Sequence, residues 1–409
     1  MSVTKFIFIG NGQYQNRGCE AITLGTIEIL RKAFGSNATF VDMHYDEPHA
    51  SPPSWASGVE NYEHEPQLRP KRFCRSWWIR NGLRVFPKLR LRYMKYENTR
   101  TMRPHIGPTA AILALGGDNY SLDYGIPYAF ICHGQFAKEH GVPFFIWGGS
   151  VGPFDKNPQF AQVMLEHLRH EVTGVFTREK RSCDYLKEHQ VENAWMMSDP
   201  AFVMEPEPVS SDQLGFEFPE NAIGVNLSPI MRRFCHQGDM EAWRKNARDI
   251  ILAIRKHFDN PIVLIPHVTI GDLNNDHLFM ESCLEGIKRD DRIYSIDGRF
   301  NARQTKWLIS RLSCLAAART HATIAAFSTC TPTISLAYSV KAFGLNEMLF
   351  GHSDYLVSPE KLCADNVVTV TEKVLEHSAE IKGQLENVMP TTRKNAYLAG
   401  EQLKEICNR

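Results

Sequence analysis

Short apolar runs rich in β-branched and aromatic residues alternate along most of the chain with longer amphipathic stretches. This alternation is typical of βα units built around parallel sheets, so we predict an α/β fold. The expected strands are Lys5–Gly10, Ala38–His44, Ala110–Gly117, Val142–Gly149, Gly174–Arg178, Ala222–Ser228, Pro261–His267, Arg292–Asp297, Ser313–Arg319 and Pro332–Tyr338. The expected helices are Cys19–Lys32, Pro158–His170, Glu179–His189, Asp239–His257, Asp276–Lys288 and Thr391–Cys407.

An acidic, proline-rich segment, Glu205–Asn221, lacks periodicity and separates the two series of strands. Such a segment predicts a linker, and 409 residues are more than one domain usually holds. We therefore expect two Rossmann-like domains facing a cleft, formed by residues 1–205 and 206–385. The remaining residues, 386–409, are expected to form a helix that crosses back to the first domain.

The composition argues against several classes of protein. The 46 basic and 46 acidic residues cancel, which argues against a nucleic-acid binder that works through its overall charge. No apolar run approaches the roughly 20 residues of a membrane span. The ten cysteines are scattered without a CxxC pair, which favours reduced thiols and a cytoplasmic location. We accordingly expect no metal site and no cofactor.

The segment 69–103 departs from this balance, because it holds twelve Lys or Arg residues and one acid, Glu97. Six aromatic residues are interleaved with these cations. An exposed, solvated pair of helices is one interpretation. The other is contact with an anionic membrane surface or a polyanionic, lipid-linked substrate. Single-stranded nucleic acid is a third possibility, but no other feature of the chain supports it.

Ligands of open parallel sheets bind beyond the carboxyl ends of the strands, so we examined those positions. A glycine-rich turn after the first strand leads to Asn16 and Glu20, and Asp118 and Asn119 follow the third strand. A carboxylate there can hold sugar hydroxyls or accept a proton from one. His267 ends a strand of the second series. Each of these residues could instead cap a helix or a turn.

Cations at strand ends predict an anion site. Arg178 follows one strand, and Arg319 and His321 lie where another strand gives way to a helix. A guanidinium, an imidazole and a helix N-terminus together favour a phosphate or a carboxylate. Lys341 is a further candidate phosphate contact. Ordinary ion pairs and helix caps are the alternatives.

Six motifs in this order resemble the polysaccharide pyruvyl transferase family over about Phe6 to Gly344. They are GNGQYQNRGCEAITLGT, LALGGDNYSLDYG, WGGSVGPF, FTREKRSCDYL, SDPAF and ARTHATIAAFSTCTPTISLAYSVKAFG. The resemblance implies a fold similar to the GT-B glycosyltransferases and transfer of pyruvate from phosphoenolpyruvate onto two hydroxyls of a sugar. By position, Arg178, Arg319 and His321 match the family's phosphoenolpyruvate-binding residues. One departure is Cys19, where many members have an acid.

From the resemblance we expect His321 to act as the acid and Asp118 or Glu20 as the base. Asn16, Asp118, Asn119 and His267 are expected to bind the acceptor. The acceptor is expected to be lipid-linked, with the protein in the cytoplasm or peripheral at the inner face of the membrane. The alternatives are a glycosyltransferase that uses a nucleotide sugar and a catalytically silent glycan-binding protein.

Overall fold

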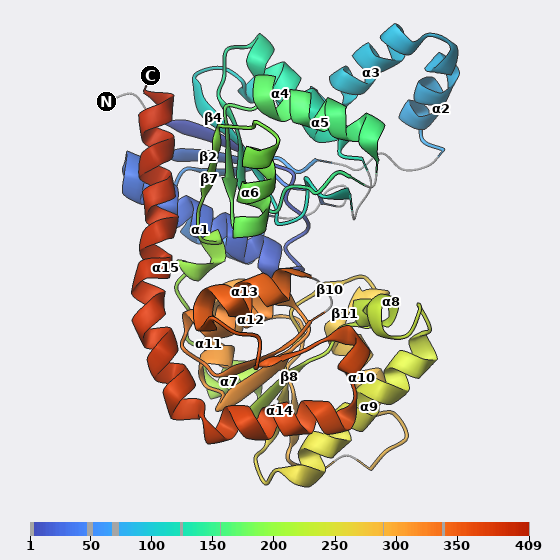
Figure 1. Cartoon of the computed structure of the whole chain (residues 1–409), viewed down its shortest axis with the longest axis vertical. Helices are drawn as coiled ribbons and strands as arrows, with labels where there is room; N and C mark the ends of the chain where they lie inside the picture. The colour runs from blue at the N-terminus through green and yellow to red at the C-terminus, as the bar shows by residue number, and fades with distance from the viewer. Residues whose placement is uncertain are drawn as a thin grey trace. The chain divides into compact units, whose positions relative to one another are not determined.

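The computed structural model describes residues 4–46, 52–67, 73–122, 126–155, 157–288, 290–337 and 340–408 (Figure 1). It divides into two compact units. Unit 1 comprises Met1–Gln13, Thr26–Pro200 and Asn395–Arg409, and unit 2 comprises Tyr14–Gly25 and Ala201–Lys394. Helices α1 (Arg17–Phe34) and α15 (Ser378–Cys407) each contribute residues to both units.

Unit 1 contains a seven-stranded parallel sheet in the order β3-β2-β1-β4-β5-β6-β7. Its strands are β1 (Lys5–Ile9), β2 (Thr39–Met43), β3 (Tyr62–His64), β4 (Thr109–Leu115), β5 (Phe144–Gly149), β6 (Gly174–Thr177) and β7 (Ala194–Met196). The central strands are buried on both faces, as in the sequence Phe6-Ile7-Phe8-Ile9 of β1, which has no exposed residue. Continuous apolar runs of this kind are what a parallel sheet covered by helices requires.

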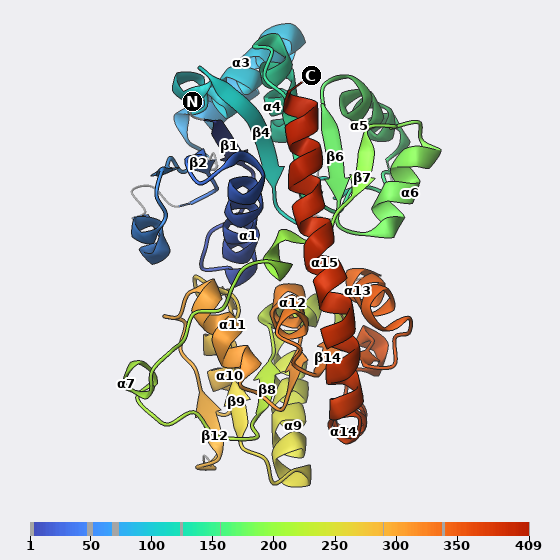
Figure 2. The same ribbon diagram turned by 90° about the vertical axis from the view of Figure 1, so that its left-hand side faces the viewer.

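The helices of unit 1 cover both faces of this sheet, because right-handed crossovers to the two sides of β1 leave them on opposite faces. They are the Thr26–Phe34 part of α1, α4 (Tyr128–Glu139), α5 (Pro158–His170) and α6 (Lys180–Glu188). The last turns of α15 lie beside α1 (Figure 2). Lys404 Nζ donates to the carbonyl of Ala33, and Gly400 packs so closely on Ile29 that a Cβ would lie 2.6 Å from its Cγ2.

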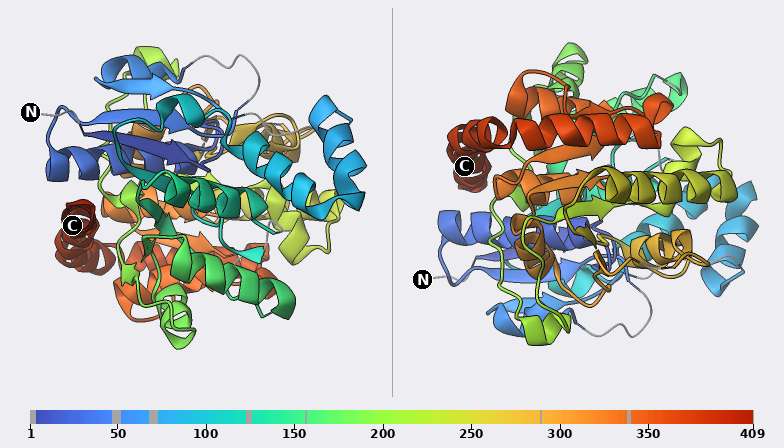
Figure 3. Two further views of the ribbon diagram at one scale, coloured as in Figure 1. Left: turned by 90° about the horizontal axis from the view of Figure 1, so that it is seen from above. Right: turned by 90° about the horizontal axis from the view of Figure 1, so that it is seen from below.

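A helical hairpin, α2 (Arg75–Gly82) and α3 (Pro87–Thr99), lies between β3 and β4 in the sequence. The two helices project from unit 1, away from its sheet (Figures 1 and 3). A short 3-10 turn at Leu83–Val85 joins them, and another follows α3 at Arg103–His105. Neither helix has a buried residue except Thr99, so the hairpin adds almost nothing to the core.

Unit 2 contains a six-stranded parallel sheet in the order β12-β9-β8-β13-β14-β15. Its strands are β8 (Ile223–Asn226), β9 (Ile262–Leu264), β12 (Ile293–Ser295), β13 (Cys314–Ala317), β14 (Thr333–Leu336) and β15 (Leu356–Val357). A separate small hairpin pairs β10 (Thr269–Ile270) with β11 (Asn274–Asn275). The main helices are α9 (Met240–His257), α10 (Asp276–Cys283), α11 (Ala302–Ser310), α12 (Thr320–Ser328), α13 (Val340–Phe350) and α14 (Ala364–Glu376).

All ten predicted strands and all six predicted helices are present, with ends that differ by a few residues or, in α15, by a longer N-terminal extension. The edge strands β3, β7 and β15 were not predicted, because strands of two or three residues are too short to show an alternating pattern. Nor was α7 (Ser211–Leu214), which lies within the expected linker. That helix is a single turn, held by a capping box between Ser210 and Gln213.

Candidate active site

Each sheet has one point at which the strand order reverses, between β1 and β4 in unit 1 and between β8 and β13 in unit 2. Ligands of such sheets bind beyond the carboxyl ends of the strands at this point. In unit 1 the Asn119 side chain spans it, because its amide nitrogen donates to the carbonyls of Gly10 and Leu115. Asn119 thus holds together the loops that follow β1 and β4.

Arg178, directly after β6, lies between two carboxylates. Its Nη1 donates to Asp199 Oδ2 at 2.8 Å and its Nη2 donates to Asp118 Oδ1 at 3.1 Å. Nη2 also donates to the carbonyl of Gly117 at 3.2 Å, and Nε donates to Ser150 Oγ at 3.4 Å. Four of the five N–H groups of the guanidinium are therefore used within unit 1.

Arg178, Asp118 and Asp199 form what we call the Arg178 cluster. With one cation and two carboxylates, its net charge is negative. Burial alone would disfavour the charge on Arg178, but the carboxylates of Asp199 and Asp118 outweigh burial and raise its pKa. The Asp118 side chain is 29% exposed and that of Asp199 only 4%. Gly117 is needed beside the guanidinium, since a Cβ there would lie 2.5 Å from Nη2.

In unit 2 the reversal point is occupied by Arg319, which stands at the N-cap position of α12. Its guanidinium donates through Nη2 to Asp276 Oδ1 at 2.8 Å and to Asn274 Oδ1 at 2.7 Å. Nε donates to both oxygens of Asp276, at 3.2 and 3.3 Å. Asp276 is completely buried. These bonds fix the plane of the guanidinium and balance its charge with one carboxylate.

Asp276 is in turn positioned by the backbone around it. Its Oδ2 accepts hydrogen bonds from the N–H groups of His267 and Val268 and from Asn226 Nδ2. Asn226, at the end of β8, also accepts the N–H of Arg319. The ends of β8 and β13 and the start of α10 are thereby joined in one buried polar network.

His321 lies in the first turn of α12, and its Nε2 atom is buried. Its ring packs directly on Gly18 of α1, where a Cβ would lie 2.5 Å from Nδ1. Asn16 precedes α1 and accepts the N–H of Gly18 with its Oδ1, so it acts as the cap of that helix. The backbone of Asn16 also forms an isolated antiparallel β-bridge with Val268.

The carboxylate of Glu20 is buried in the same region. Its Oε2 accepts a hydrogen bond from Arg17 Nη1 at 2.9 Å, and the backbone N–H of Ala302 also faces it. Burial raises the pKa of Glu20 although Arg17 opposes this. Arg17 Nη2 donates to the carbonyl of Gly298, which ties the start of α1 to the loop before α11.

His267 is 4% exposed, and its Nδ1 has no hydrogen-bond partner among the residues that the structure describes. Burial lowers its pKa well below the ordinary value, and the charges of His321, Arg319 and Arg17 add to this. His267 is therefore a neutral imidazole at neutral pH. Its backbone carbonyl accepts the N–H of Arg17.

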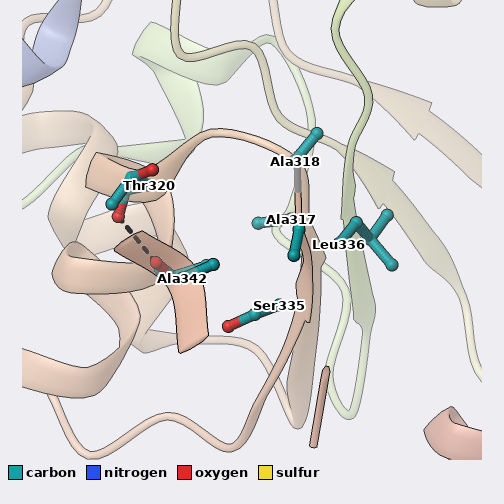
Figure 4. A pocket seen from close by; sticks show the side chains of 8 residues that line it. Ala317, Ala318, Thr320, Ser335, Leu336 and Ala342 are labelled. Carbon is teal, nitrogen blue, oxygen red and sulfur yellow. Dashed lines mark hydrogen bonds between the residues drawn. The ribbon is translucent and has the colours of Figure 1, made fainter. Parts of the chain in front are cut away.

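A small pocket lies at the carboxyl ends of β13 and β14, beside the first turn of α12 (Figure 4). It is lined mainly by small side chains: Ala317, Ala318, Thr320, Thr323, Ser335, Leu336, Ala337 and Ala342. Lys341 is the second residue of α13, next to Ala342, but its side chain lies outside the described part of the chain.

The predicted residues thus fall into two groups. Asn16, Glu20, His267, Arg319 and His321 meet in unit 2, whereas Asp118, Asn119 and Arg178 meet in unit 1. Asn16 and Glu20 were expected in the first domain, but they belong to unit 2 and make their contacts there.

Three residues that hydrogen-bond within the two arginine clusters were not predicted as site residues: Asn226, Asp276 and Asp199. Asp276 was noted only as the start of a helix. Asp199 was noted only as part of a motif.

A family model described as polysaccharide pyruvyl transferase matches residues 16–340. The chain belongs to this family. The matched span includes both arginine clusters and the turn at the start of α1. The family membership expected from the six motifs is confirmed.

Solved structures show that this pyruvyl transferase family member has a GT-B-like fold. It is similar to a Staphylococcus aureus MnaA–UDP co-structure (TM-score 0.58, 12% identity, 98% of this chain and 95% of that chain). It is also similar to Anabaena Alr3699/HepE in complex with UDP-glucose (TM-score 0.58, 11% identity, 99% of each chain). A third similar structure is UDP-GlcNAc 2-epimerase from Neisseria meningitidis bound to UDP-GlcNAc (TM-score 0.58, 9% identity, 98% of this chain and 99% of that chain). No curated protein matches the chain significantly in sequence.

Proposed function

We propose that this family member transfers the pyruvyl group of phosphoenolpyruvate onto two hydroxyls of a sugar and releases phosphate. The observation that carries the proposal is the Arg319–His321 pair at the N-terminus of α12, where the β8 and β13 ends meet. A helix N-terminus and an oriented guanidinium favour a small anion, and the reversal point of the sheet is where such folds bind ligands.

Two features support unit 2 as the donor side. Arg319 is held by Asp276 in a fixed orientation, so little conformational entropy is lost when it contacts an oxyanion. The positive charge of Arg17 balances the carboxylate of Glu20, and that of Arg319 balances Asp276. A bound anion therefore meets no net negative charge. Lys341 follows β14 in the same unit and stays a proposed phosphate contact.

The proposed reaction begins when His321 gives a proton to the methylene carbon of phosphoenolpyruvate, which makes the adjacent C2 an oxocarbenium-like centre. A sugar hydroxyl attacks C2, and Glu20 takes its proton and returns it through solvent to His321. The C2–O bond to phosphate then breaks, and phosphate leaves with the electron pair. The second hydroxyl closes the ketal and its proton ends on phosphate. Burial raises the pKa of Glu20, which makes its carboxylate a stronger base toward the hydroxyl proton.

Unit 1 is proposed to hold the acceptor. Asp118 is the partly exposed acid of the Arg178 cluster, and carboxylates readily bind pairs of sugar hydroxyls. Asn119 positions the Asp118 loop through its bonds to Gly10 and Leu115. Arg178 was predicted to bind phosphoenolpyruvate. Its four donated bonds favour a different role, that of orienting Asp118.

The helical hairpin α2–α3 supports a lipid-linked acceptor. Between residues 73 and 103 it carries nine Lys or Arg residues against the single acid Glu97. Large apolar side chains are exposed among them: Phe73, Trp78, Val85, Phe86, Leu89, Leu91 and Tyr96. Cations and exposed aromatics together suit an anionic lipid surface. Among the described residues, no helix is long and apolar enough to cross a membrane.

The donor is tested by thermal unfolding with phosphoenolpyruvate, a UDP-sugar or inorganic phosphate, in the wild type and in His321→Gln and Arg319→Lys. At a hundred times its dissociation constant, phosphoenolpyruvate should stabilise the wild type by about 2.7 kcal/mol. Both variants should lose this shift. His257→Gln, at the exposed end of α9, is the matched control and should keep it.

Phosphate release from phosphoenolpyruvate in the presence of a diol sugar tests the chemistry. Release that disappears in His321→Gln supports the proposal. A thermal shift with the UDP-sugar alone would replace it by glycosyl transfer, in line with the UDP ligands of the similar structures. Sugar binding without release of phosphate would make the protein a glycan-binding one.

Membrane contact is tested separately by sedimentation with vesicles that contain anionic or only neutral lipid. Reversal of charge at Arg80, Arg84 and Arg92 should abolish binding to the anionic vesicles and spare turnover of a soluble acceptor. Equal binding by the wild type and the variant would exclude this role of the hairpin.

A further inference from the structure

Three side chains of the types that can bind a metal ion meet in unit 1, outside the two arginine clusters, at the carboxyl ends of β2 and β3. His44 directly follows β2, Asp46 lies two residues further on, and His64 ends β3. One ligand atom from each of the three residues lies within 4.8 Å of those of the other two. Since β2 and β3 are neighbouring parallel strands, their ends bring together residues twenty positions apart.

His44 is oriented as metal-binding histidines are. It is completely buried, and its Nδ1 lies 3.2 Å from Asp42 Oδ2. Tyr62 donates its hydroxyl hydrogen to the same carboxylate oxygen. A carboxylate on one ring nitrogen fixes the other for a metal, and His44 Nε2 points to Asp46, 3.3 Å from Oδ2.

His64 supplies the second imidazole. The centroids of the His44 and His64 rings are 4.8 Å apart. Both ring nitrogens of His64 are buried, and neither has a hydrogen-bond partner within the described ranges. Buried polar atoms without partners are costly, and a ligand would satisfy them.

We propose that His44, Asp46 and His64 bind one divalent transition-metal ion of the zinc class, with water in the remaining position. Two imidazoles and one carboxylate match the donors that Zn²⁺ prefers, whereas Mg²⁺ and Ca²⁺ prefer oxygen ligands alone. Asp42 acts as the supporting carboxylate behind His44.

The site would stabilise the loop after β1. Asp46 Oδ1 accepts a hydrogen bond from Gln13 Nε2 at 3.3 Å, and Tyr45 N–H donates to the carbonyl of Asn11. A metal bound to Asp46 therefore restrains the segment that leaves the sheet beside the reversal point of unit 1. This role is independent of which donor the enzyme uses.

The experiment is calorimetric titration of the full chain, without an affinity tag and stripped of metal, with ZnCl₂. We expect one site per chain, weakened at least tenfold in His64→Gln. Asp42→Asn should weaken it roughly tenfold to a hundredfold, as loss of a supporting carboxylate does. His105→Gln is the matched control, because His105 lies with Glu63 and Glu65 in a more exposed group nearby. It should bind Zn²⁺ as the wild type does.

The absorption spectrum with Co²⁺ identifies the ligands. Tetrahedral d–d bands without thiolate charge transfer support the site, whereas thiolate bands would assign the metal to cysteines and overturn the proposal. Equal Zn²⁺ affinity in the wild type, His64→Gln and His105→Gln would also overturn it. If His64→Gln fails to fold by circular dichroism, Asp46→Asn takes its place with the same expected loss.

Discussion

The two arginine clusters use the same kind of residue in different electrostatic settings. Arg319 faces one acid, Asp276, which is completely buried and receives further hydrogen bonds from the backbone. Arg178 faces two acids, Asp199 and the partly exposed Asp118. The first pair is neutral and rigid, whereas the second cluster carries a net negative charge that reaches solvent.

This difference separates two chemical tasks. A neutral pair at a helix N-terminus leaves the dipole to favour an anion. A cluster with a surplus carboxylate repels an anion but accepts hydrogen bonds from hydroxyls. On this ground we propose that unit 2 binds the anionic donor and unit 1 the polyol acceptor, and each prediction below would contradict or sharpen that proposal.

The largest expected effect is on stability. Asp276→Asn leaves the buried Arg319 without its counter-charge, which commonly costs about 3–5 kcal/mol. Asp118→Asn should cost about 1 kcal/mol or less, because Asp118 is partly exposed and Arg178 keeps Asp199. Urea unfolding of the two variants measures the difference.

The double variant Asp276→Asn with Arg319→Met is the control, since it removes both charges together. It should recover most of the loss seen in Asp276→Asn. Similar losses for Asp276→Asn and Asp118→Asn would show that the two clusters do not differ as described.

A second prediction uses the glycines that pack on each cluster. Gly18→Ala places a methyl group against the His321 ring, and Gly117→Ala places one against the Arg178 guanidinium. A displacement of about 1 Å at a reacting group can reduce a rate about a hundredfold. We expect Gly18→Ala to weaken the thermal shift with phosphoenolpyruvate, and Gly117→Ala to raise KM for the acceptor instead.

Gly383→Ala is the matched control for this pair. Gly383 lies within α15 with nothing near its Cβ position, so alanine there should stabilise the helix by up to about 1 kcal/mol and leave turnover unchanged. If Gly18→Ala and Gly117→Ala affect the same substrate, the assignment of donor and acceptor to different units fails.

The smallest expected effect is the pH dependence of stability that arises from Glu20. Its folded-state pKa is raised by burial above the ordinary 4.5, so the native protein keeps a proton that the unfolded chain releases. The contribution of Glu20 is therefore greatest below pH 4.5 and is lost as pH rises through the folded-state value.

Glu20→Gln should abolish this loss, so its stability relative to the wild type should increase as pH rises above 4.5. Urea unfolding at several pH values measures the change. A constant difference between the two proteins would mean that Glu20 titrates normally, and would weaken its proposed role in proton transfer.

Much of the fold and half of the site follow from local sequence. Apolar runs predict the strands, and the change from Ala317-Ala318 to Thr320 predicts where α12 begins. The motifs around Arg178 and Arg319 predict the family. These features depend on neighbours along the chain, so periodicity and motif order reveal them.

The partners of these residues were decided by the tertiary structure alone. Asp276 meets Arg319 from 43 positions away, and the start of α1 joins unit 2 although the rest of that helix belongs to unit 1. His44 and His64 meet only because β3 adds to the edge of the sheet. No local pattern marks such pairs, because the free energy that selects them comes from burial and charge pairing between distant segments.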